Sequence, residues 1–208
     1  RIRVEANTLS FTGTSTPGLS PGAPTGVTAA SVPPLISAPS LRIASIAGVA
    51  MPPVPIGSAT TPDVTLPVGT GSLVPVVLTA NNIPVPTLFT VQVHIPTTSS
   101  PMVTVTSGAS SGSFASSTAT ANVTLTPSQV SVLIVYANFN IPPTIARLFP
   151  LIDGEEVDHV MMAAELGETS STSLVTKHGK KVDLDQLSRE DQLRVATAFE
   201  ALQHSAGN

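Results

Sequence analysis

Hydrophobic and polar residues alternate through the middle of the chain. Between residues 89 and 95 every second residue is Phe, Val or Ile, and the residues between them are Thr, Gln and His. This two-residue period predicts a β-strand that buries one face and exposes the other. The same alternation recurs in residues 103–106 and 118–125, and residues 74–79 form another short apolar strand. Residues 130–139 are almost wholly apolar, which predicts a central strand covered on both faces.

These five segments follow one another closely, and no helical pattern separates them. The residues between them are rich in Asn, Ser, Gly and Pro, which favour turns. Short, regularly spaced strands without intervening helices indicate an antiparallel β-sandwich. We therefore expect residues 68–140 to form one sandwich domain in a mainly β protein.

The N-terminal end carries a separate alternating segment. Its apolar residues at strand spacing are Ile2, Val4, Ala6, Leu9 and Phe11. Polar or charged residues lie between them, so the pattern predicts a lone strand that belongs to no neighbouring hairpin.

A proline-rich stretch follows this strand and completes the first region, residues 1–67. Ten prolines lie between residues 17 and 62. Proline at this density excludes helix and favours an extended or polyproline-like chain. Nine aliphatic residues between residues 35 and 56 are too many for a solvated linker. We expect this extended arm to lie against an apolar surface.

The third region, residues 141–208, begins at a Pro-Pro pair and has the composition of an ordinary soluble domain. A two-residue connection, His178-Gly179, suits a tight hairpin turn between two short strands. Residues 155–166 fit either a strand or a helix, and we favour a strand. This strand would complete a small sheet.

A helix is predicted at the C-terminal end. Ser188 is a good N-cap, with Asp191 at the third helical position, and apolar residues then recur at helical spacing. The helix is expected from Arg189 to about His204. The third region is therefore predicted to be a small α+β region ending in a helix.

The distribution of charge along the chain is unusual. Between Ala6 and Ala146 the only charged residues are Arg42 and Asp63, and 17 of the 22 charged residues follow Ala146. The surface of a free soluble domain is usually about a quarter charged. We expect much of this surface to be covered by other copies of the chain, by another part of the cell envelope, or by glycans on Ser and Thr.

Composition excludes several classes of function. The net charge of −4 argues against nucleic acid as a partner, and the absence of cysteine excludes disulfides and thiolate metal sites. No apolar run approaches the roughly 20 residues of a transmembrane helix. The chain starts with Arg rather than Met, which fits a removed leader and an exported, extracellular or cell-surface protein.

Part of the middle region resembles a known class of domain. The resemblance is carried by the runs Leu78-Thr79-Ala80-Asn81-Asn82-Ile83-Pro84-Val85, Ser113-Phe114-Ala115-Ser116-Ser117-Thr118-Ala119-Thr120-Ala121 and Val123-Thr124-Leu125. These runs are similar to the immunoglobulin-like domains of exported bacterial surface proteins. The resemblance implies an extracellular structural or adhesive role and gives no ligand site, because the Cys and Trp core of antibody-type domains is missing.

One segment matches the pattern of a hydrolase. The sequence from Gly108 to Gly112 is G-x-S-x-G around Ser110, and Asp158 and His159 follow in the chain order of a triad. That motif requires a sharp strand-to-helix turn, and no helical pattern follows Gly112. We therefore predict no catalytic residue and no enzyme.

Two groups of carboxylates also have an ordinary explanation. The cluster at residues 153–159 lacks the D-x-D-x-D-G order of a calcium loop, so a solvated turn is expected. Asp183 and Asp185 could share one face of a strand, as in glycosidases, but acidic residues are common where a helix starts. With no Trp and with Tyr136 in an apolar strand, a carbohydrate-binding module is disfavoured. No cofactor or metal is predicted.

The features together predict an extracellular structural subunit that assembles with copies of itself into a filament or surface layer. The N-terminal strand would be donated to the sheet of a neighbouring copy, through the assembly residues Ile2, Val4, Ala6, Leu9 and Phe11. The alternative is a monomeric or envelope-anchored adhesion or spacer module whose arm packs on its own sandwich.

Overall fold

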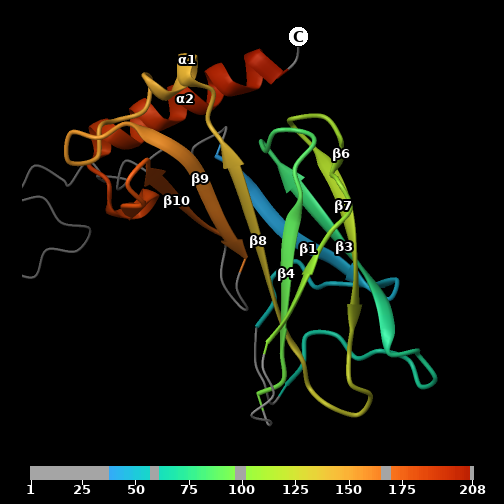
Figure 1. The fold of residues 1–208 in the computed structure, drawn as a ribbon. Coiled ribbons are helices and arrows are strands. Elements are labelled where there is room, and N and C mark those ends of the chain that lie inside the picture. Colours follow the sequence, from blue (N-terminus) through green and yellow to red (C-terminus); the bar gives the residue numbers. More distant parts are fainter. Residues whose placement is uncertain (1–37, 57–60, 97–101, 165–169, 207–208) are drawn as a thin grey trace, which may run out of the picture. The chain divides into compact units, whose positions relative to one another are not determined.

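The computed structural model describes residues 38–56, 61–96, 102–164 and 170–206, and these residues form two antiparallel sheets and a C-terminal helix (Figure 1). The five-stranded sheet has the order β2-β1-β3-β7-β6, with β1 (Ser40–Ile46), β2 (Val49–Ala50), β3 (Leu73–Asn81), β6 (Ser111–Gly112) and β7 (Ser117–Thr124). The six-stranded sheet has the order β11-β10-β9-β8-β4-β5, with β4 (Phe89–His94), β5 (Val103–Thr106), β8 (Val132–Asn140), β9 (Val157–Ala164), β10 (Ser171–Thr176) and β11 (Lys181–Asp183). The helices are α1 (Pro143–Ala146), a 3₁₀ turn η1 (Leu184–Gln186) and α2 (Arg189–Ala206). The prediction of a mainly β protein that ends in a helix is confirmed. The predicted N-terminal strand lies outside the described residues.

All five strands predicted in the middle region are present. They are β3, β4, β5, β7 and β8, and the alternating burial of β4 and β7 follows the predicted two-residue period. The expectation for β8 was wrong in one respect. Although β8 is central, between β9 and β4, it buries one face fully, with Val135 inward, while Ile134 and Tyr136 on the other face are half-buried.

Strand β1 was not predicted, because its region was assigned to the Pro-rich arm. It pairs with β3 along its length, so this part of the arm belongs to the sandwich. The inward-facing residues Leu41, Ile43 and Ile46 are spaced by two and then three, because a β-bulge inserts Ala44 between Ile43 and Ser45. The bulge breaks the alternation by which the other strands were identified.

The C-terminal elements agree with the prediction. Residues 157–164 form a strand, β10 and β11 form a hairpin around His178-Gly179, and α2 begins directly after Ser188. The Ser188 hydroxyl caps the helix, since it accepts a hydrogen bond from the backbone N–H of Asp191 at 3.2 Å. However, β9 pairs with β8 from Val135 to Asn140, so the region after residue 140 continues the sheet of the sandwich.

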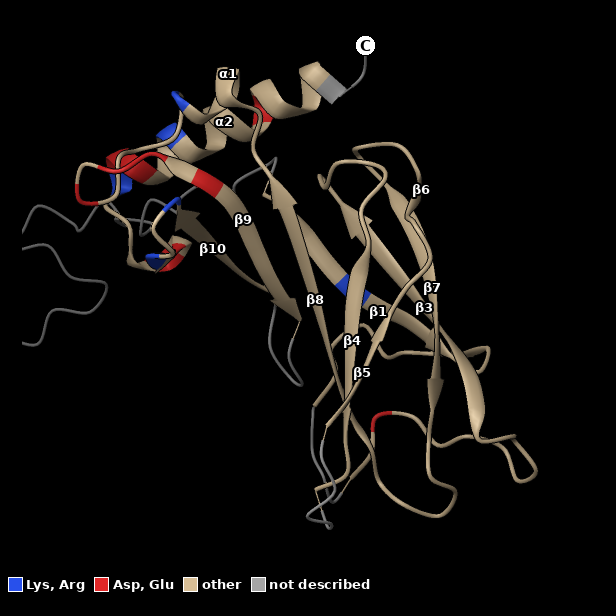
Figure 2. Ribbon diagram, in the orientation of Figure 1, with Lys and Arg blue, Asp and Glu red and all other residues tan. Residues whose placement is uncertain are grey.

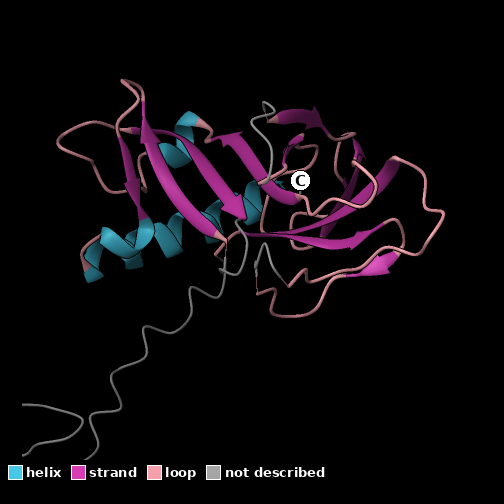
Figure 3. Ribbon diagram, turned by 90° about the horizontal axis from the view of Figure 1, so that it is seen from below, coloured by secondary structure: helices cyan, strands magenta, loops and turns pink. Residues whose placement is uncertain are grey.

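The core is continuous across both sheets and the helix. Val195, Ala198, Phe199 and Leu202 of α2 are fully buried in the same apolar cluster as the strands. The ring of Phe199 meets that of Phe149 edge to face, with 5.5 Å between centroids. Seen from below, the helices lie together beside strands at one side of the molecule, and the other side consists of strands and loops (Figure 3).

No helix in the described part of the chain is long and apolar enough to cross a membrane.

Candidate functional site

Two of the four sheet edges are protected against pairing with another chain. Strand β2 has only two residues and is followed by Pro52 and Pro53. Strand β11 has three residues and carries Lys181 and Asp183. Short length, proline and charge are the usual means by which proteins block edge-to-edge association.

The other two edges lie on one side of the molecule and carry no charge. Strand β5 ends the six-stranded sheet, β7 and β6 end the five-stranded sheet, and β5 contacts β7. In Figure 2, strands β3 to β8 carry no Lys, Arg, Asp or Glu. Strand β6 is as short as β2, but the described residues of β5, β6 and β7 carry no proline and no charge, and β7 itself has eight residues.

Strand β6 covers only the first residues of β7. It pairs with Ser117 and Thr118, and the N–H of Gly108 donates to the carbonyl of Thr120 at 2.9 Å. From Ala121 to Thr124 the outer edge of β7 has no strand partner among the described residues.

The backbone groups of this edge point away from the sheet. The carbonyl of Thr120 faces outward to Gly108, whereas the N–H of Leu125 donates inward to Ser72 at 2.8 Å. Because backbone direction alternates along a strand, the N–H and C=O groups of Asn122 and Thr124 also face outward. They form a short row of donors and acceptors ready for an added strand.

Next to this row the interior of the sandwich is incompletely covered. Val103 and Val105 of β5 pair with Val93 and Val91, so their side chains share the inward face. Val91 and Val93 are buried, whereas Val105 is half-buried and Val103 is 49 % exposed. In the described part of the five-stranded sheet, β6 pairs only with Ser117 and Thr118, so no strand continues it alongside residues 121–124 of β7.

We name residues 121–124 of β7, together with Val103 and Val105 of β5, the open edge. It offers main-chain hydrogen bonds and an apolar strip side by side, which are the two requirements of strand addition. The sequence did not indicate this site. The assembly residues Ile2, Val4, Ala6, Leu9 and Phe11 lie outside the described residues.

The acidic cluster and the lysines of the hairpin, which the sequence places apart, meet in the structure. Lys180 pairs with Asp153, Lys177 with Glu156 at 3.3 Å, and His178 with Glu155 at 3.2 Å. We name this group the charged clasp, because it ties the turn before β9 to the β10–β11 hairpin. Its geometry is that of a structural ion-pair network, and the described residues contain no group of three or more potential metal ligands.

One carboxylate of the clasp has a perturbed acidity. A hydrogen bond from the Thr176 hydroxyl, and then the neighbouring His178, hold the pKa of Glu155 below its usual 4.5, against the opposing effect of burial. The ionised form of Glu155 is therefore favoured in the folded protein.

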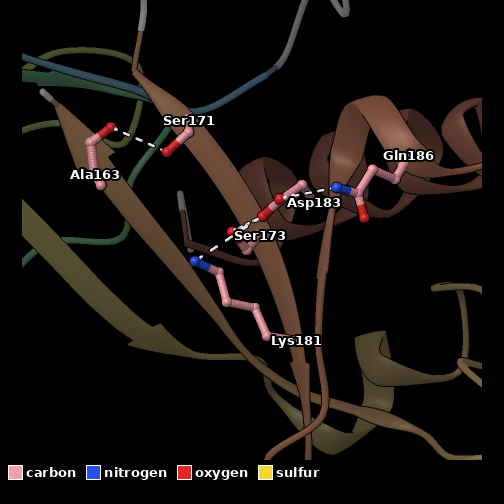
Figure 4. Close-up of polar contacts among 6 residues, drawn as sticks. All are labelled: Ala163, Ser171, Ser173, Lys181, Asp183 and Gln186. Atoms are coloured by element: carbon pink, nitrogen blue, oxygen red, sulfur yellow. Dashed lines mark hydrogen bonds and ion pairs between the residues drawn. The ribbon is translucent and has the colours of Figure 1, made fainter.

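The remaining carboxylates considered for chemistry have structural partners. Asp183 accepts hydrogen bonds from Ser173 Oγ at 2.6 Å and Gln186 Nε2 at 3.3 Å, with Lys181 Nζ at 4.0 Å (Figure 4). Asp185 lies in the following 3₁₀ turn rather than on the same strand. The two carboxylates are thus not paired on one strand face.

The hydrolase-like segment is also built into the fold. Ser110 is 4 % exposed, and its hydroxyl accepts the backbone N–H of Thr87 at 2.8 Å. The segment ends in β6, and the chain then turns into β7. A strand therefore follows Gly112, where the hydrolase motif would require a helix. Asp158 and His159 contact each other at 3.1 Å on β9.

Comparison with protein-family models, curated proteins and solved structures gave no match. Evidence about function therefore comes from the chain itself. The open edge is the feature of the described residues that departs most from a closed, self-sufficient sandwich.

Proposed function

We propose that the protein is an extracellular structural subunit whose copies assemble into a filament or surface layer by strand addition at the open edge. The observation that carries this proposal is the exposure of Val103, which shares the inward face of the sheet with Val93, beside backbone groups of β7 that have no strand partner among the described residues. An added strand with apolar residues at every second position would cover Val103 and Val105. Its backbone would also form hydrogen bonds with the N–H and C=O groups of Asn122 and Thr124.

The donated segment is the N-terminal strand of another copy. Its residues Ile2, Val4 and Ala6 have the required period, and Leu9 and Phe11 extend the apolar series. The 26 residues from 12 to 37 can span up to roughly 85 Å when extended, so the segment can reach a neighbouring subunit. Each copy then donates one strand and accepts one strand at its open edge.

Such a contact is heterologous, because two different surfaces meet. Heterologous contacts propagate into a fibre unless their rotation closes a ring. The low charge between Ala6 and Ala146 is consistent with a surface that is covered in the assembly or coated by glycans on Ser and Thr. An immunoglobulin-like ancestry, a Pro-rich tether and export to the cell surface are part of the same proposal.

The decisive experiment removes one backbone N–H group from the open edge and leaves the fold intact. Asn122→Pro deletes an N–H that faces outward, and proline is tolerated at such edge positions. Asn122→Thr keeps the N–H and serves as the matched control. Light scattering and electron microscopy should show large particles for the native chain and N122T, and monomers for N122P with an unchanged thermal midpoint.

Two results would contradict the proposal. Polymer formation by N122P would show that β7 is not the acceptor, and Thr104→Pro then tests the outward N–H groups of β5 in the same way. A native chain that stays monomeric at all concentrations would favour the adhesion or spacer module.

A further inference from the structure

A second apolar feature lies directly beyond the open edge. The end of the sandwich from which β7 leaves is hollowed into a groove of about 490 Å³, between residues 62–71 and the β7–β8 connection. Its apolar lining comes from both sheets and the two loops, namely Ile46, Val64, Leu66, Leu125, Val130 and Leu133. Its size is within the roughly 300–1,000 Å³ of small-ligand pockets, so it can hold an aromatic ring with an aliphatic neighbour.

The groove is continuous with the open edge. Leu125 lines the groove and follows Thr124 directly in the chain. None of the described residues that line it is charged, so a charged ligand would lose its hydration there without gaining a partner among them. The chemistry of the groove fits an uncharged apolar segment.

The chain contains one phenylalanine with no place in the described core. Phe89, Phe114, Phe139, Phe149 and Phe199 are each at most 7 % exposed. The sixth phenylalanine is Phe11, in the N-terminal segment, where it is followed by more than 25 residues without charge. Phenylalanine has the largest apolar side chain in that segment, so Phe11 gains the most from burial and is its strongest apolar anchor.

We propose that the groove is a socket for the N-terminal arm donated by a second copy. Phe11 of that arm would fill the groove, and Leu9 would lie at its entrance. This inference rests on the strand addition proposed above and adds an anchor and a direction to it. Phe11 lies five residues beyond Ala6, about 16 Å in extended chain. That reach takes the segment from the open edge past Leu125 into the groove.

The direction of the added strand follows from this placement. Phe11 is C-terminal to Val4 and Ala6, and the groove is at the C-terminal end of β7. A segment that occupies both sites therefore runs parallel to β7, and its tether leaves from the groove. An antiparallel strand would place Phe11 at the opposite end, near the β6–β7 turn.

Disulfide cross-linking tests the contact in the full chain, which has no cysteine of its own. Phe11→Cys is mixed with either Val130→Cys, in the groove, or Ala115→Cys, in the exposed β6–β7 turn. The parallel arrangement yields a covalent heterodimer of F11C with V130C and none with A115C. A heterodimer with A115C instead, or with neither variant, would overturn the inference.

A second measurement separates this inference from the proposed function. Loss of an anchor costs roughly 2 kcal/mol, so Phe11→Ala should raise the concentration needed for assembly about 30-fold, with Phe11→Leu restoring most of it. Thr12→Ala is the matched control and should assemble like the native chain. If F11A assembles normally while N122P does not, strand addition stands and the socket is wrong. If N122P also assembles normally, the proposed function itself fails.

Discussion

Val93 and Val103 face each other across β4 and β5 on the inward side of the six-stranded sheet, yet Val93 is 4 % exposed and Val103 is 49 % exposed. The pair therefore marks the boundary at which the cover from the five-stranded sheet ends. Neighbouring residues on β5 alternate between this uncovered interior and the outer face. A substitution on each face can therefore separate the role of the interior from that of the surface.

Val103→Lys should leave the monomer folded and prevent assembly. A lysine at a half-exposed position can extend into water, and exposed substitutions usually change stability by within about 0.5 kcal/mol. Covered by an added strand, the same unpaired charge would lose its hydration at a cost of several kcal/mol. Thr104→Lys, on the outer face, should assemble like the native chain in light scattering. Equal behaviour of the two variants would show that the inward face of β5 is not covered in the assembly.

Gly112→Ala should destabilise the protein by more than about 1 kcal/mol. Gly112 has φ +129°, and an added Cβ would lie 2.5 Å from the carbonyl oxygen of Ser116. Gly108→Ala is the control, since its nearest contact is 3.8 Å away and ordinary. Thermal or urea unfolding should show a much larger decrease in stability for G112A than for G108A. Equal midpoints would mean that the β6–β7 turn contributes nothing to stability.

Phe199→Ala should lower stability by roughly 3–5 kcal/mol in a single unfolding transition. Phe199 is fully buried, and because β8 pairs with β9 the helix end and the sandwich share one core. Leu193→Ala on the same helix is the control, because Leu193 is 53 % exposed. Calorimetry that resolves two transitions, with only one of them shifted in F199A, would contradict a single cooperative unit.

The contribution of Glu155 to stability should disappear in acid. Its pKa is lower in the folded chain than in the unfolded chain, so its stabilising effect is present above pH 4.5 and is lost as the pH falls through the folded value. The difference in unfolding free energy between the native chain and Glu155→Gln should therefore shrink below about pH 4.5. Thr176→Val, which lacks the hydroxyl, should reduce that pH dependence, while Thr176→Ser keeps it. A difference that stays constant from pH 7 to pH 3 would contradict this assignment.

Local patterns were sufficient to predict most of the strands. Alternation identified β4 and β7, and the capping residue Ser188 identified the start of α2, because these features depend on neighbours in the sequence. Strand β1 was missed because its bulge at Ala44 changes the spacing of the inward residues and because prolines flank it.

The open edge could not be predicted, because it depends on registers between distant segments. The open edge begins after Thr120, because the carbonyl of Thr120 is still paired with Gly108. Val103 faces inward because β5 pairs with β4 in the register that places Val103 opposite Val93. The charged clasp has the same origin, since Asp153 and Lys180 meet through the pairing of β9 with β10. Neither relationship leaves a signal in composition or periodicity.

The pairing of β1 with β3 also determines how the protein would resist a pull on the chain. Ser40 begins β1 opposite Asn81, and the pairing runs along the strand to Ile46 opposite Val76. A pull on the chain at Ala38, directed along the strand, loads these hydrogen bonds in shear, so they must break together rather than one after another. A tether attached at this end therefore pulls on the sandwich in its more resistant direction, which is the property required of a link in a load-bearing fibre.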